Sequence, residues 1–88
     1  MKRKAIWRKG EWTRRVYTYK GQRMVAEGYE IDFLINGQVQ AGFVGVPDYK
    51  KNVFKLRGTI VWRYATYVPK TREIPMGSEG KEFEIEVE

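Results

Sequence analysis

Residues 33–43, FLINGQVQAGF, decide the fold because they predict a β-hairpin. The dipeptide Asn36-Gly37 favours the left-handed backbone of a tight turn. Apolar and polar residues alternate on both sides of it, as they do in strands that bury one face. The sequence therefore predicts two antiparallel strands that are joined at this point.

The length of the loop decides which side chains share a face. A two-residue loop would place Phe33 opposite Gln40 and would mix apolar and polar residues on both faces. A three-residue loop that ends in a G1 bulge at Gly37 places Phe33 opposite Val39 instead, and one face becomes apolar. We therefore predict the three-residue loop. The same register pairs Ile31 with Ala41 and Tyr29 with Phe43.

Outward from this hairpin, the rest of the chain has the features of short strands. β-branched and aromatic residues are abundant, glycines recur at strand-length intervals, and helical spacing is not sustained over any full window. We predict strands at Lys4–Arg8, Glu11–Tyr19, Met24–Leu34, Gln38–Val46, Val53 to about Val68, and Glu82–Val87. We expect turns at Lys9-Gly10 and Lys20-Gly21, a bulge or break at Gly28, a bend near Gly58, and loops over residues 46–52 and 69–80.

These elements predict an all-β fold. At 88 residues the chain is expected to form a single domain that spans residues 1–88. The expected architecture is an antiparallel meander of about five to seven strands with little or no helix. It would form a curled sheet or a partly open barrel, of the SH3-like or OB-like kind.

The composition excludes several classes of function. The chain has no cysteine, which excludes disulfides and thiolate zinc sites, and no histidine, the commonest general base and metal ligand. Ser78 is the only serine, and no histidine is present to activate it. We therefore expect no enzyme, no catalytic residue, no metal and no cofactor. No apolar stretch is long enough for a membrane span or a secretory signal, so we expect a cytoplasmic protein without membrane contact.

Charge alternates in blocks along the chain. The net charges are +8 over residues 1–23, −4 over 24–49, +7 over 50–72 and −5 over 73–88, with a total of +6. Oppositely charged strands could pair and cancel within one sheet. Alternatively, the two basic blocks could form one cationic face for a polyanion.

Basic and aromatic residues are interleaved over residues 7–20 and 54–67. Lys and Arg neutralise phosphates, and aromatic rings stack on unpaired bases, so this combination is typical of nucleic-acid surfaces. If the strand from Val53 stayed regular, one of its faces would be core and the other a basic outer row. The predicted core face carries Phe54, Leu56, Ile60, Trp62, Tyr64 and Val68. The predicted phosphate contacts are Arg14, Arg15, Lys55, Arg57 and Arg63, and the predicted stacking residues are Tyr17, Tyr19 and Tyr67.

The sequence favours a small basic domain that binds nucleic acid, with RNA or another single strand preferred because no recognition helix is predicted. The first alternative is a protein-interaction or inhibitor module, of the kind found in viruses or mobile elements. It would use the basic and aromatic surface or an edge strand. The second alternative is a ribonuclease that works without histidine.

Overall fold

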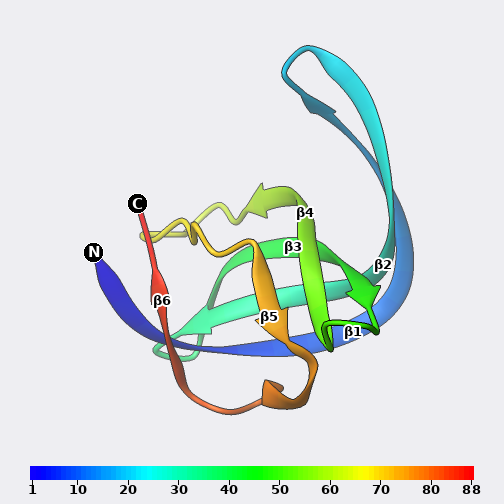
Figure 1. Ribbon diagram of the computed structural model, residues 1–88. Helices are drawn as coiled ribbons and strands as arrows, with labels where there is room; N and C mark the ends of the chain where they lie inside the picture. Colours follow the sequence, from blue (N-terminus) through cyan, green and yellow to red (C-terminus); the bar gives the residue numbers. More distant parts are fainter.

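The computed structural model describes residues 1–88 as one curled sheet of six antiparallel strands in the order β5-β4-β3-β2-β1-β6 (Figure 1). The strands are β1 (Lys2–Tyr19), β2 (Gln22–Ile35), β3 (Gln38–Asp48), β4 (Val53–Val61), β5 (Glu73–Pro75) and β6 (Phe83–Glu86). Apart from the 3-10 turn Met76–Ser78 the chain has no helix, and so none that is long and apolar enough to cross a membrane. The predicted all-β fold, a curled meander, is confirmed.

The inner, concave face of this half-barrel holds the core. Alternation places Ile31, Phe33 and Phe43 there, where each is almost completely buried. Trp7 packs edge-on against Phe54, with ring centroids 5.8 Å apart. Burying a large apolar side chain contributes roughly 1.5–3 kcal/mol, so these residues hold the sheet in its curl. The core cluster consists of Ala5, Trp7, Ile31, Phe33, Ile35, Ala41, Phe43, Phe54, Leu56, Ile74, Ile85 and Val87.

The turn between β2 and β3 has two residues, so the predicted three-residue loop is wrong. Asn36 and Gly37 both have positive φ, 53° and 78°, as a two-residue turn of the mirror-image type requires. Leu34 pairs with Val39 next to this turn. The register then shifts, and Phe33 pairs with Ala41 rather than with Val39.

Gln40 is the extra residue that produces this shift, and it forms a β-bulge in β3. The bulge returns Ala41 and Phe43 to the inner face, where they were predicted. Val39 was predicted on the same face, but it pairs with Leu34 and lies outside the core cluster. The other predicted pairs are also wrong, because Ile31 pairs with Phe43 and Tyr29 with Gly45.

The Gln40 side chain is only 2% exposed. Its Oε1 accepts hydrogen bonds from the backbone N–H groups of Thr66 and Tyr67, at 2.8 and 3.0 Å.

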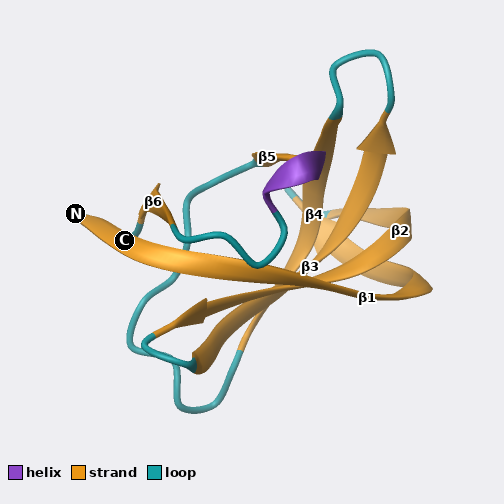
Figure 2. Cartoon of the chain, turned by 90° about the horizontal axis from the view of Figure 1, so that it is seen from below, coloured by secondary structure: helices purple, strands orange, loops and turns teal.

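β1 runs unbroken from Lys2 to Tyr19, so the predicted turn at Lys9-Gly10 is wrong. A bulge between Lys9 and Trp12 stands there instead. Past this bulge, residues 12–28 of β1 and β2 form a two-stranded ribbon, which we call the arm. The arm ends in the predicted turn at Lys20-Gly21 and curls back toward β4 (Figure 1). The view from below shows the same fold-back (Figure 2).

The arm bends across β3 at a close contact between two glycines. β2 continues through Gly28 with no shift in its pairing to β1, so the break expected there is absent. A Cβ atom on Gly28 would lie 2.2 Å from the Gly45 carbonyl oxygen. Gly28 is therefore required for the close approach of two backbones.

The expected bend at Gly58 is a bulge in β4, and it reverses the faces of the residues that follow. Gly58 has a φ of 58°, and the pairing with β3 shifts across it. β4 then ends at Val61, not at Val68. Ile60 is 43% exposed after this reversal, and Trp62 and Tyr64, which lie beyond the end of β4, are 49% and 80% exposed. The prediction that these three residues belong to the core is therefore wrong.

Residues 68–72 join the two edges of the sheet. The N–H of Lys70 donates to the Glu86 carbonyl in β6, and the N–H of Leu56 in β4 donates to the Arg72 carbonyl. β5 follows within the segment that was predicted to be a loop. Ser78 supports this region, because its Oγ accepts from the Trp7 indole and donates to the Pro75 carbonyl, both at 2.8 Å.

The glutamate row of β6 faces lysines of the neighbouring β1. Lys2 lies 3.7 Å from Glu84, and Lys4 lies 3.8 Å from Glu82. These pairs are exposed, so each contributes at most about 1 kcal/mol. They nevertheless compensate the positive charge at the start of the chain.

Candidate functional site

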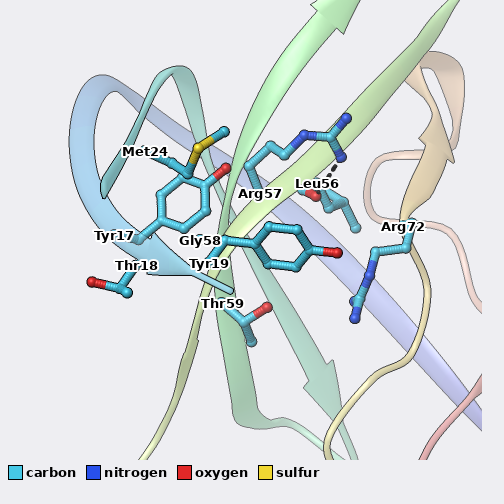
Figure 3. Close-up of a pocket in the computed structure, with 9 residues that line it drawn as sticks. All are labelled: Tyr17, Thr18, Tyr19, Met24, Leu56, Arg57, Gly58, Thr59 and Arg72. Carbon is cyan, nitrogen blue, oxygen red and sulfur yellow. Dashed lines mark hydrogen bonds between the residues drawn. The ribbon is translucent and has the colours of Figure 1, made fainter. Parts of the chain in front are cut away.

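A groove of about 580 Å³ lies between the arm and β4 (Figure 3). The arm supplies one wall, and β4 with residue 72 supplies the other. It is lined by Tyr17, Thr18, Tyr19, Met24, Leu56, Arg57, Gly58, Thr59 and Arg72.

The groove exists because the arm is attached to the bulge in β4. Arg15 Nη1 donates a hydrogen bond of 2.7 Å to the Gly58 carbonyl. The Tyr17 ring lies so close that a Cβ on Gly58 would be 3.2 Å from its Cδ1. Ala26 and Val44 are buried although neither belongs to the core cluster, so the arm also shields part of the outer face of the sheet.

Two aromatic rings enter the groove from the arm. Tyr17 is half-buried opposite Met24, its partner across the two strands, whereas Tyr19 is 56% exposed. In Figure 3 both rings point into the groove, and the Tyr19 ring extends toward Arg72. The ammonium group of Lys20 lies 5.3 Å from the centroid of the Tyr19 ring and adds positive charge beside it.

Two arginines line the same groove as these rings. Arg57 and Arg72 are exposed, and neither takes part in an ion pair. Arg57 bonds only to the carbonyl of Leu56, and Arg72 only to that of Thr71, which leaves most of their N–H groups free. No Asp or Glu lines the groove. The arrangement can therefore hold a planar group against a ring while an anion is bound beside it.

The comparisons found no match for this chain among protein-family models, curated proteins or solved structures. A function must therefore be inferred from the geometry and charge of the groove.

The structure brings three of the predicted site residues, Tyr17, Tyr19 and Arg57, into the groove. Arg15 lies at its border as the anchor of the arm. Arg14 lies on the other face of the arm, where its Nε is 3.5 Å from a Glu27 carboxylate oxygen.

The remaining three predicted site residues lie outside the groove. Lys55 pairs with Asp48 at 3.4 Å. Arg63 stands over the Tyr64 ring, 5.6 Å from its centroid, beyond the end of β4. Tyr67 is half-buried against the core, with the Arg3 guanidinium over its ring.

The ion pair of Lys55 belongs to a small network in the β3–β4 turn. The backbone N–H of Lys51 donates to Asp48, and this bond is the main cause that lowers the pKa of Asp48. The Lys55 ammonium group lowers it further. Lys55 thus already has an anionic partner, unlike Arg57.

Sequence reasoning missed Met24 and Arg72 as groove residues. Met24 could have been found, because the predicted turn at Lys20-Gly21 places it directly opposite Tyr17. Arg72 lies in a segment that was predicted to be a loop. Its position depends on the hydrogen bond between its carbonyl and Leu56, for which the sequence has no signal.

Proposed function

We propose that this protein is a small basic domain that binds single-stranded nucleic acid in the groove between the arm and β4. One observation carries the proposal. Two tyrosine rings and two unpaired guanidinium groups line the same groove, and no carboxylate lines it.

Each group in the groove matches a part of a nucleotide. Tyr17 and Tyr19 offer ring faces to unpaired bases, and such stacking contributes about 1–3 kcal/mol per base. Arg57 and Arg72 can neutralise phosphates and release their counterions. Bases in a duplex are already paired and stacked, and the chain has no α-helix to insert into a major groove. A single strand of RNA or DNA is therefore the expected ligand.

The direct test is the salt dependence of binding to a labelled single-stranded oligonucleotide, measured by fluorescence anisotropy. We expect the logarithm of the affinity to fall linearly with the logarithm of the salt concentration, with a slope of about −0.7 for each neutralised phosphate. Undetectable binding at low salt to both RNA and DNA would overturn the proposal.

The variants Arg57→Ala and Lys55→Ala form a matched pair for this experiment. Both remove one cation from β4, but only Arg57 is free of an ion pair. We expect Arg57→Ala to weaken binding and to reduce the salt slope by roughly one phosphate, with a clearly smaller effect from Lys55→Ala. Equal effects would mean that the strand does not lie in this groove.

A second candidate function, a protein-interaction module, is favoured by the opposite face of the arm. Trp12, Val16 and Val25 are exposed there, and tryptophan is common among the residues that dominate protein interfaces. A partner that is recovered by pull-down and stays bound after nuclease treatment would support this function. Loss of the complex on nuclease treatment would favour nucleic-acid binding.

A further inference from the structure

A second, smaller hollow lies just beyond the end of β4. It has a volume of about 310 Å³ and is lined by Gln38, Val39, Trp62 and Tyr64. Trp62 and Tyr64 are among the exposed large apolar side chains of the chain, and both lie beyond the end of β4. The hollow therefore presents two rings to solvent.

This hollow and the groove open on the same face of the sheet. Arg57 pairs with Val44, and Ile60 pairs with Gly42. Residues 42 and 44 are two apart on β3 and therefore lie on the same face of the sheet, which here is the outer face. The Trp62 indole lies over the same face, because its Nε1 is 3.7 Å from the position of a Cβ on Gly42. Gly58 and Trp62 are four residues apart, or about 13 Å at 3.3 Å per residue. One strand of a duplex advances about 3.4 Å per nucleotide and an extended single strand advances further, so at most about four nucleotides span this distance.

The charges around the hollow differ from those in the groove. A Cβ atom added to Gly42 would lie 3.2 Å from Asp32 Oδ1 and 3.7 Å from Trp62 Nε1. The Asp32 carboxylate is therefore close to the Trp62 indole. A phosphate is disfavoured next to this carboxylate, whereas a neutral base is not. The cation of this region is Arg63, whose guanidinium lies 5.6 Å from the Tyr64 ring centroid. A base would therefore be favoured at Trp62 and Tyr64, and a phosphate at Arg63.

We infer that Trp62 and Tyr64 form a second base-stacking subsite, with Arg63 as its phosphate contact. A single strand would run from the arm groove along the outer face of β4 to this subsite. The inference rests on the proposed function and deepens it, because the bound strand then extends beyond the groove to a second stacking site.

The test compares labelled single-stranded oligo(dC) of two and nine nucleotides at low salt, by fluorescence anisotropy. We expect Trp62→Ala and Tyr64→Ala each to weaken binding of the nine-nucleotide strand at least about fivefold, the equivalent of about 1 kcal/mol of stacking. Binding of the two-nucleotide strand, which is too short to reach from the groove to Trp62, should change less than about twofold. Both side chains are exposed, so the variants should fold.

The matched control is Tyr49→Ala. Tyr49 is 76% exposed, close to Tyr64 at 80%, and is followed by Lys50 and Lys51, but it lies in the turn at the opposite end of β4. We expect this variant to bind both strands like the wild type. A loss as large as that of Trp62→Ala would show that any exposed ring beside cations contributes, and would overturn the subsite.

The remaining outcomes separate the two proposals. If neither strand binds at low salt, the proposed function fails, and the subsite fails with it. If the nine-nucleotide strand binds and both variants match the wild type, the subsite is overturned while the groove stands. Equal losses for the short and the long strand would also overturn it, because the subsite would then not extend the groove.

Discussion

Gln40 connects the central hairpin to the chain that follows β4. Its buried amide oxygen accepts two backbone hydrogen bonds, from Thr66 and Tyr67, and its own residue forms the bulge in β3. A buried N–H group that loses its partner costs about 1–3 kcal/mol. This one side chain therefore holds the backbone at Thr66 and Tyr67.

We expect Gln40→Ala to lower the free energy of unfolding by about 2–4 kcal/mol, because it leaves two N–H groups without an acceptor. Urea denaturation measures this loss. The matched control is Gln38→Ala, an exposed position two residues earlier, which should change stability by less than about 0.5 kcal/mol. Similar losses in the two variants would contradict this role for Gln40.

Asp48 gives the β3–β4 turn a dependence on pH. The Lys51 N–H bond and Lys55 lower its pKa below the ordinary value of 3.8. A lowered pKa in the folded state stabilises the fold above the ordinary value, and the stabilisation is lost as the pH falls through the folded-state pKa. We expect Asp48→Asn to flatten the decline of Tm below about pH 4. Identical declines in the variant and the wild type would refute this.

Among the elements, the arm depends on the contact between Gly28 and Gly45. We expect Gly28→Ala to destabilise the protein by several kcal/mol or to prevent folding, because its Cβ would lie 2.2 Å from a backbone oxygen. Gly77→Ala is the control, since nothing lies within 4 Å of its Cβ position and its φ is not positive. Thermal unfolding followed by circular dichroism compares the two. A Gly28→Ala variant as stable as Gly77→Ala would show that the crossing can relax.

The strands show which features of the fold can be predicted from the alternation of apolar and polar residues. Alternation correctly predicted that Ile31, Phe33, Ala41 and Phe43 face the core, because a strand repeats every two residues, but it wrongly placed Val39 there. The bulges at Gln40 and Gly58 were not predictable in the same way. A glycine in the sequence can indicate a bend. Whether the side chains after the bend change to the other face of the sheet depends on how the strand pairs with its neighbour, which the sequence does not show. Trp62 and Tyr64 were assigned to the core for this reason.

At the scale of the whole molecule, the structure shows that the charge blocks partly pair within the sheet, which is one of the two roles that the sequence allowed. The lysines at the start of β1 are matched by the glutamates of β6. Arg57 and Arg72 remain unpaired at the groove. Tyr17, Tyr19 and Arg57 were predicted from the sequence as binding residues, but the sequence did not predict that all three line one groove. Their meeting depends on the curl of the arm, which a contact between distant residues, Arg15 and Gly58, holds in place.

The central claim is that a single strand binds between the arm and β4. It is tested most directly by backbone amide chemical shifts, measured as single-stranded oligonucleotide is added to the isotope-labelled protein. We expect the largest shifts at Tyr17, Tyr19, Arg57, Gly58 and Arg72, the residues that line the groove. Largest shifts on the opposite face of the arm, at Trp12, Val16 and Val25, would contradict the claim, as would a spectrum that does not change.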